Sequence, residues 1–256
     1  MPPTWVELFT SDTDRAVDFY SSLLGWTAED TSGEYGGYRI FQRAGQQISG
    51  LIHNDGTSGG PDSWTVYLAT ENAAATAAAA TRHGGQVVVG PMQVGKMGQM
   101  AVIGDPGGAA IGAWQPMAHT GFEAAGEVGD GSPVWFELHT RDYARCVDFY
   151  REVFGWDAHT LSDTEELRYT QCGEGDTAQA GIRDASGSLA EGTPAWWAVY
   201  FQVPDTDAAV GTVQDLGGSL VAAPESSPFG RMATVADPAG VRFGLIDETG
   251  TQPSSS

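Results

Sequence analysis

The sequence lacks several features that would assign it to a well-defined class. It has only two cysteines among 256 residues, Cys146 and Cys172, and they match no metal or redox spacing. No apolar run is long enough to cross a bilayer, and no charged-then-apolar leader precedes the first strand. A disulfide scaffold, a cysteine-ligated metal and a membrane span are therefore not expected, and we predict a soluble cytoplasmic protein.

Positive charge is also scarce. The chain has 12 Lys and Arg residues against 33 Asp and Glu, which gives a formal net charge of −21. A surface of this sign repels phosphate backbones and anionic lipids. We therefore expect neither nucleic acid nor a membrane as a partner, and a small-molecule ligand remains as the expected partner.

The sequence does contain a strong internal repeat. Residues 3–26 align with residues 133–156 at a shift of 130, and 13 of the 24 positions are identical. A second, weaker repeat over 64–114 and 197–246 follows at nearly the same shift. The chain therefore consists of four modules in the order A, B, A′, B′. A Gly/Ala/Glu-rich linker near 116–132 separates the two halves.

Each module is predicted to run strand, helix, then several short strands. In the first module residues 5–10 alternate as a strand, Asp12 is a good helix N-cap, and Gly25 ends the helix. A tight Asp-Pro-Gly-Gly turn at 105–108 joins two strands of the second module. This order predicts an α+β fold of four βαβββ modules, in which two modules join their curled sheets into a half-open cup.

The repeat also predicts the domain boundaries. The expected segments are a first domain 1–116 (modules 1–60 and 61–116), a linker 117–132, a second domain 133–248 (modules 133–192 and 193–248) and a disordered tail 249–256.

The opening pattern strand-x-Asp…Phe-Tyr…Gly-Trp and the closing pattern Gly-Gly…Asp-Pro-x-Gly resemble the vicinal oxygen chelate superfamily. Its members include glyoxalases, extradiol dioxygenases and bleomycin resistance proteins. The double-length form is similar to actinobacterial two-domain glyoxalase-like antigens. The resemblance covers about residues 3–115 and 133–248 and implies two glyoxalase-like domains. It does not fix an activity, because one fold can carry many chemistries.

The resemblance also implies where a metal would bind. Enzymatic members hold a divalent metal with a His near the start of the first strand of each module and a Glu on the last strand. The corresponding positions here carry side chains that are not metal ligands, and they are Trp5, Thr65 (or Trp64), Trp135, Ala198 (or Trp197), Gly112 and Gly244. Such a metal needs three or four converging nitrogen, sulfur or oxygen donors. We therefore expect no metal and no cofactor.

Strand alternation predicts which side chains line the two cups. If Val6 and Leu8 pack under the helix, the alternate residues of the same strand face the cup. The predicted linings are Trp5, Glu7, Phe9, Thr65, Tyr67 and Trp114 for the first cup, and Trp135, Glu137, His139, Tyr200, Gln202 and Arg242 for the second. Aromatic walls with a few polar groups are typical of small-molecule sites.

Glu7, Glu137 and His139 are the candidate catalytic residues. A carboxylate against aromatic rings is expected to have a raised pKa and to act as a general acid or base. A structural role, in which each Glu is bonded to a neighbouring Tyr, Arg or backbone donor, is the favoured alternative. In the second cup Arg242 could pair with Glu137 and lower its pKa instead, and His139 could orient Glu137. The other histidines are expected to be ordinary surface residues, and they are His53, His83, His119 and His159.

Three functions are compatible with these patterns. The favoured one is metal-independent binding of a small, largely apolar organic molecule, either to sequester a drug or toxin or within a natural-product pathway. The second is a metal-free isomerase, cyclase or hydrolase that uses a cup carboxylate. The third is a metal-dependent glyoxalase or dioxygenase. Because the linings differ, we expect two different ligands or one functional cup and one relic, in a pseudo-symmetric monomer or a homodimer.

Overall fold

The structure is a computed structural model that describes residues 1–31, 36–57, 59–122 and 129–247. The predicted tail 249–256 and residues 123–128 of the predicted linker lie outside the described residues. Within the described ranges, none of the helices is long and apolar enough to cross a membrane.

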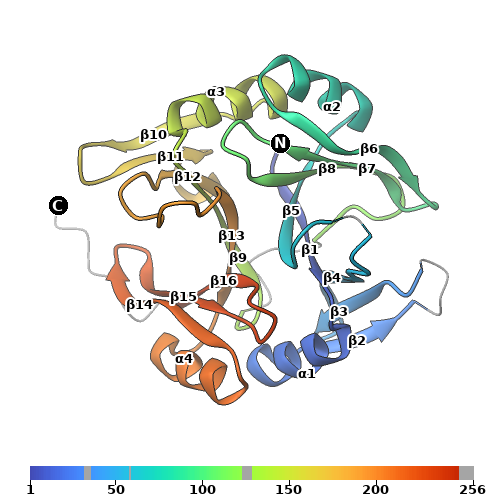
Figure 1. Cartoon of the computed structure of the whole chain (residues 1–256), viewed down its shortest axis with the longest axis vertical. Helices are drawn as coiled ribbons and strands as arrows, with labels where there is room; N and C mark the ends of the chain where they lie inside the picture. The colour runs from blue at the N-terminus through green and yellow to red at the C-terminus, as the bar shows by residue number, and fades with distance from the viewer. Residues whose placement is uncertain (32–35, 58, 123–128, 248–256) are drawn as a thin grey trace. The chain divides into compact units, whose positions relative to one another are not determined.

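The order strand, helix, strands recurs in all four modules, as predicted (Figure 1). The first module contains β1 (Pro3–Thr10), α1 (Thr13–Leu24), β2 (Thr27–Asp30), β3 (Arg39–Arg43) and β4 (Gln46–His53). The second contains β5 (Ser63–Ala69), α2 (Ala73–Arg82), β6 (Gln86–Val94), β7 (Gly98–Gly104) and β8 (Ala110–Pro116). The third contains β9 (Pro133–Thr140), α3 (Tyr143–Phe154), β10 (Ala158–Asp163), β11 (Arg168–Cys172), the 3-10 turn η1 (Gly175–Thr177) and β12 (Ala180–Asp184). The fourth contains β13 (Trp196–Gln202), α4 (Thr206–Asp215), β14 (Ser219–Ser227), β15 (Gly230–Ala236) and β16 (Arg242–Asp247).

The strands form two eight-stranded mixed sheets. Their orders are β2-β3-β4-β1-β5-β8-β7-β6 and β10-β11-β12-β9-β13-β16-β15-β14. Within each module the first and last strands are parallel, as in β1 with β4 and β9 with β12, and the others are antiparallel. The α+β fold of two glyoxalase-like domains is confirmed.

The helix boundaries of the first module follow the local sequence signals. Asp12 caps α1 by accepting a hydrogen bond from the Arg15 backbone N–H, and Gly25 ends the helix with a left-handed φ of 69°. On β1, Val6 and Leu8 are fully buried, so the predicted alternation of the opening strand is confirmed.

By compactness the chain divides into two units, and each combines modules from different halves of the sequence. Unit 1 consists of Met1–Trp5, Thr65–Gly121 and Trp135–Ala198. Unit 2 consists of Val6–Trp64, Phe122–Val134 and Val199–Ser256. The repeat alone could not reveal this combination, and the domain boundaries drawn from the repeat stay a prediction.

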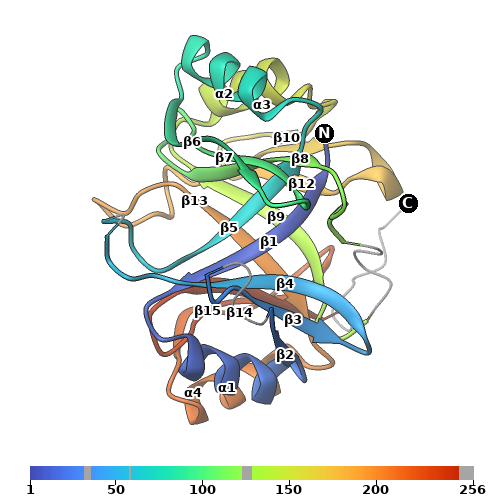
Figure 2. The ribbon, with the colours of Figure 1, turned by 90° about the vertical axis from the view of Figure 1, so that its right-hand side faces the viewer.

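Within unit 1, α2 and α3 lie side by side (Figures 1 and 2). The fully buried Tyr150 of α3 donates a hydrogen bond of 3.0 Å to Asp105 in the Asp-Pro turn, and Trp197 donates to the same hydroxyl at 2.9 Å. Asp105 also accepts from the backbone N–H groups of Gly107 and Ala109. The repeated Phe-Tyr and Asp-Pro motifs are therefore partners, because the helix of one module hydrogen-bonds to the turn of another.

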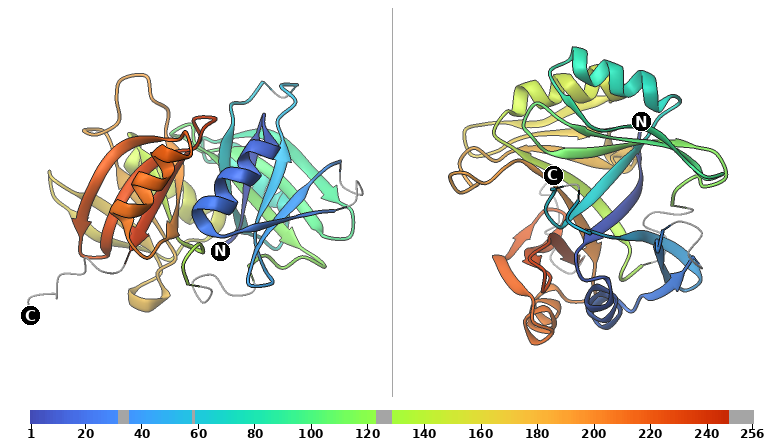
Figure 3. Two further views of the ribbon diagram at one scale, coloured as in Figure 1. Left: turned by 90° about the horizontal axis from the view of Figure 1, so that it is seen from below. Right: turned by 45° about the vertical axis from the view of Figure 1, so that its right-hand side comes forward.

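Unit 2 repeats this arrangement with α1 and α4, which are adjacent (Figure 3). Tyr20 of α1 donates to Asp237 at 3.2 Å, and Trp64 donates to Tyr20 at 3.1 Å. Satisfying a buried carboxylate in this way is expected where a helix packs against a turn.

Candidate functional site

In unit 1, one face of the third module gathers polar and aromatic side chains. Strand register places Glu137 of β9 opposite Gly181 of β12, and His139 opposite Arg183. Arg183 in turn lies opposite Tyr169 of β11. Since paired residues point to the same side of a sheet, these side chains share one face.

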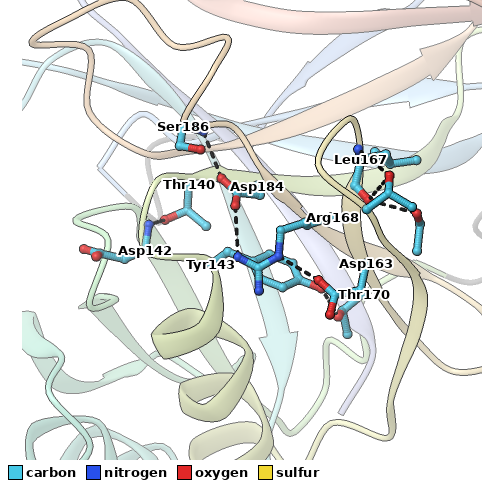
Figure 4. Close-up of polar contacts among 11 residues, drawn as sticks. Thr140, Asp142, Tyr143, Asp163, Leu167, Arg168, Thr170, Asp184 and Ser186 are labelled. Atoms are coloured by element: carbon cyan, nitrogen blue, oxygen red, sulfur yellow. Dashed lines mark hydrogen bonds and ion pairs between the residues drawn. The ribbon is translucent and has the colours of Figure 1, made fainter.

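The other face of the same strands is anchored to α3 (Figure 4). Arg168 forms ion pairs with Asp163 at 2.8 Å and Asp184 at 3.4 Å, and its guanidinium lies 4.8 Å from the ring centre of Tyr143. The Tyr143 hydroxyl hydrogen-bonds to Thr170 at 2.5 Å. These contacts fix β10–β12 against the helix.

A chain of hydrogen bonds holds the Glu137 carboxylate. Tyr169 donates to Glu137 Oε2 at 2.6 Å, and Trp135 Nε1 donates to the Tyr169 hydroxyl at 3.0 Å. Glu137 is only 5% exposed. A Cβ atom at Gly181 would lie 2.1 Å from the Tyr169 hydroxyl oxygen. The missing side chain at position 181 is therefore what allows Tyr169 to reach Glu137.

His139 completes the group beside Glu137. Its Nε2 lies 2.9 Å from Glu137 Oε1, and the imidazole stacks on the Trp196 ring at 5.2 Å with an interplanar angle of 23°. This close contact with the imidazole is one of the causes that lower the pKa of the Glu137 carboxyl.

The charge state of Glu137 differs from the sequence-based expectation. Burial by itself would raise the pKa of Glu137, but His139, the Tyr169 hydrogen bond and the charge of Arg183 outweigh it and lower the pKa. The expected rise is therefore wrong for this residue. At neutral pH the carboxylate is anionic, which suits hydrogen-bond acceptance better than proton donation.

The equivalent tryptophan of the first module, Trp5, is covered by its own chain. The Trp5 ring meets His119 edge-on at 4.5 Å, and His119 also contacts Trp114 at 5.8 Å. The indole N–H of Trp114 donates to the His119 carbonyl at 2.9 Å, and Thr4 donates to the Thr120 carbonyl at 2.9 Å. Burial lowers the pKa of His119. The expectation that His119 is an ordinary surface residue is wrong, because it is partly buried between two tryptophans.

The remaining predicted lining residues have varied surroundings. In unit 1, Tyr67 is buried and Thr65 is partly exposed. In unit 2, Tyr200 is buried, whereas Glu7, Phe9 and Gln202 are partly exposed and Arg242 is exposed. The Gln202 backbone is hydrogen-bonded to Gly131 and Ser132.

Sequence reasoning missed Tyr169, Gly181, Arg183 and Trp196. The first three lie on inner strands whose register no local pattern revealed. For Trp196 the sequence offered one signal, the Trp-Trp pair at 196–197, but it did not show that the two rings lie in different surroundings. Trp197 is buried against Tyr150, and Trp196 is partly exposed beside His139.

A family model described as the Glyoxalase/Bleomycin resistance protein/Dioxygenase superfamily matches residues 3–112 and 132–245. The chain belongs to this superfamily. Among its relatives, the anthracycline biosynthesis protein DauV of Streptomyces sp. (strain C5) is 33% identical, over 99% of this chain and 96% of that protein. The putative glyoxylase CFP32 of Mycobacterium tuberculosis is 31% identical, over 95% of this chain and 94% of that protein.

Solved structures of the superfamily share the fold. The Mn(II)-bound glyoxalase from Novosphingobium aromaticivorans aligns with a TM-score of 0.64 at 17% identity, over 96% of this chain and 82% of that one. The 2,3-dioxygenase LapB from Pseudomonas sp. KL28 aligns with a TM-score of 0.62 at 13% identity, over 100% and 95%.

The metal positions implied by the superfamily do not fit these residues. The last-strand positions are Gly112 and Gly244, which lie opposite Tyr67 and Tyr200. A Cβ atom at either glycine would lie 2.1 Å from the tyrosine ring, so a carboxylate there would require the ring to move. Among the described residues, no group of three or more His, Cys, Asp or Glu side chains is arranged to hold a metal ion.

Proposed function

We propose that the protein binds a small, flat and largely apolar organic molecule on the face of the third module that carries Glu137, beside Trp196 of β13, without a metal, as part of a natural-product pathway. The observation that carries this proposal is an aromatic surface around one anionic carboxylate. Trp135 and Trp196 are partly exposed, and Glu137 is held between Tyr169 and His139. Ring faces beside one oriented polar group are the usual make-up of a small-molecule site.

The contrast between the two equivalent tryptophans supports the choice of face. Trp5 is 5% exposed and lies against His119, whereas Trp135 is partly exposed. A covered ring has no face to offer a ligand. The third module is therefore the better candidate for binding.

The relatives favour a natural-product role over drug or toxin sequestration. Two relatives with nearly the same length, from Streptomyces sp. (strain C5) and Streptomyces peucetius, carry the name anthracycline biosynthesis protein, each at 33% identity. Anthracyclines are planar and polycyclic, and such rings suit stacking on tryptophan. The chemical class that we propose is accordingly a fused-ring aromatic compound, and neither nucleic acid nor a membrane.

A metal-free proton-transfer enzyme is the second candidate. The specific observation in its favour is the buried Glu137–His139 pair at 2.9 Å. The lowered pKa of Glu137 weakens it as a base, which is why binding ranks first. Under the enzyme hypothesis, Glu137→Gln would abolish turnover while ligand affinity persists.

The test uses tag-free protein dialysed against a chelator and checked by elemental analysis. A purified anthracycline is titrated in while tryptophan fluorescence is followed. We expect saturable binding by metal-free protein, and an affinity at least about tenfold lower in Trp196→Ser, which removes one stacking ring. The matched control is Gly187→Ala in the same unit, where an added Cβ meets nothing within 4 Å. Binding that appears only after a divalent metal is restored would overturn the metal-independent proposal.

A further inference from the structure

We propose that β6 of one copy of the chain docks antiparallel beside β14 of a second copy, through exposed apolar side chains and flanking charges of opposite sign. The proposal goes beyond the proposed function and does not depend on ligand binding. β6 belongs to unit 1 and β14 to unit 2, and each strand is considered in its own surroundings.

Both strands present apolar side chains to solvent. Among the strands that the structure describes, β6 and β14 are each the last of their sheet (Figure 1). On β6 Val88 is 58% exposed and Met92 is 50% exposed, and on β14 Leu220 is 40% exposed and Val221 is 46% exposed. Apolar side chains that gather on an exposed edge with a charged border mark a contact with another protein.

A bulge at the same place in both strands shapes this apolar surface. The pairing of β6 with β7 shifts register at Val88, and the pairing of β14 with β15 shifts at the equivalent Val221. Each is the most exposed large apolar residue of its strand. Bulges re-aim side chains and interrupt the ladder, and Pro91 of β6 offers no N–H. The contact is therefore made by side chains and not by a continued sheet.

The other two terminal strands do not share this character. β2 carries Glu29 and Asp30, and β10 ends on Asp163. Charged side chains on an edge strand discourage association. β6 has no charged side chain over its nine residues. The apolar edges are thus a property of the second and fourth modules, and a second copy that meets β6 can offer the matching strand β14.

The charges around the two strands have opposite signs. Residues 82–100 contain two basic residues, Arg82 and Lys96, and no acidic residue. Residues 205–227 contain four acidic residues and no basic residue. Since the formal net charge of the chain is −21, two copies repel each other over most of their surface. Complementary charge at β6 and β14 selects this contact over others.

The spacing of the charges fits an antiparallel arrangement. Arg82 lies four residues before β6 and Lys96 lies two residues after it. Asp215 lies four residues before β14, and Glu225 lies near its end. Antiparallel docking brings Lys96 towards Asp215 of the second copy, and Arg82 towards Glu225 of the second copy. All four residues are exposed, and none forms an ion pair within the described part of the chain.

Sedimentation velocity over a concentration series of the full chain tests the contact. We expect the mass of the wild type to rise with concentration towards that of two chains, because a two-fold dimer uses the contact twice. Val88→Asp places a carboxylate in the apolar contact and should raise the Kd at least about tenfold. The matched control is Leu161→Asp on β10, where the side chain is 53% exposed, and it should leave the Kd unchanged.

A charge reversal tests which strands meet. Lys96→Glu and Asp215→Lys each replace attraction by repulsion at both contacts of a two-fold dimer, so each variant alone should dimerise at least about fivefold more weakly than the wild type. An equimolar mixture of the two variants restores opposite charges at both contacts and should dimerise like the wild type. Thermal melts at a concentration where the chain is single confirm that each variant is folded.

The outcomes decide the proposal. A wild type that remains a single chain at every concentration would overturn it. So would a dimer that Val88→Asp leaves intact, or one that Leu161→Asp weakens equally. A mixture of the two charge variants that dimerises no better than either alone would show that β6 does not meet β14. None of these results bears on ligand binding, so the proposed function is tested separately.

Discussion

Trp5 and Trp135 occupy equivalent positions of the repeat, yet their surroundings differ. The chain that follows β8 covers Trp5, and the indole lies against His119. Trp135 is partly exposed and donates to Tyr169, which in turn holds Glu137. The same residue type thus serves as core in one module and as the outer end of a polar network in another.

The residues around Glu137 also differ from their equivalents in the first half of the chain. The third module has His139 and Arg183 where the first has Phe9 and Ile52, and the fourth has Trp196 where the second has Ser63. Each change adds a titratable or aromatic group to the surroundings of Glu137. The third and fourth modules therefore carry the chemically equipped face, and Trp5 of the first module serves packing.

The largest expected effect is a difference in the free energy of unfolding between the variants Trp5→Ala and Trp135→Ala. Trp5→Ala removes a buried ring and should lower the free energy of unfolding by about 3–5 kcal/mol. Trp135→Ala should cost about 1 kcal/mol, because the ring is partly exposed, and should impair ligand binding instead. Urea denaturation of the two variants checks the difference. Equal losses would mean that Trp135 is as much a core residue as Trp5.

A smaller effect is expected from Gly181→Ala. The added Cβ would meet the Tyr169 hydroxyl at 2.1 Å, so Tyr169 must leave Glu137, at a cost of about 1–3 kcal/mol. Gly187→Ala, which meets nothing within 4 Å, should change stability by less than about 0.5 kcal/mol. Thermal denaturation measures both. If Gly181→Ala were as stable as its control, the hydrogen bond from Tyr169 would not depend on the glycine.

Asp105, which lies in the Asp-Pro turn and accepts a hydrogen bond from Tyr150 of α3, should make the free energy of unfolding depend on pH. Burial raises the pKa of Asp105 from 3.8 to about 6. Because the folded state binds this proton more tightly than the unfolded chain, stability should rise as pH falls through the folded pKa. We expect a gain of about 1 kcal/mol between about pH 7 and pH 5.

Denaturation at the two pH values tests the wild type against Asp105→Asn, in which this contribution should be absent. The equivalent Asp237 of unit 2 also has a pKa raised by burial, so a residual slope in the variant is expected. An unchanged slope in Asp105→Asn would assign the pH dependence to other groups.

The smallest effect concerns Arg183. Arg183→Ile, which introduces the residue found at Ile52, removes a positive charge that lowers the pKa of Glu137. The pKa of Glu137 should therefore rise, and affinity for the anthracycline should fall by about twofold to fivefold. A pH series of calorimetric titrations shows whether loss of binding begins at a higher pH in the variant. No shift would mean that His139 and Tyr169 alone set the charge state of Glu137.

Much of the fold was predictable from local signals. The 13 identical positions between residues 3–26 and 133–156 predicted the repeat. The alternation of the opening strands predicted that Glu137 and His139 share one face. The inner strands were not predictable in the same way. Tyr169 reaches Glu137 only because two antiparallel pairings set its register and a glycine on the neighbouring strand leaves room.

The sequence by itself determined the four modules, their helix ends and the alternation of their strands, because caps, turns and periodicity act over a few neighbouring residues. Only the tertiary structure decided which modules pack into one unit, that His119 packs against Trp5, and that the pKa of Glu137 falls instead of rising. Each of these depends on contacts between segments far apart in the chain. Their energies come from burial and charge at positions that no local pattern encodes.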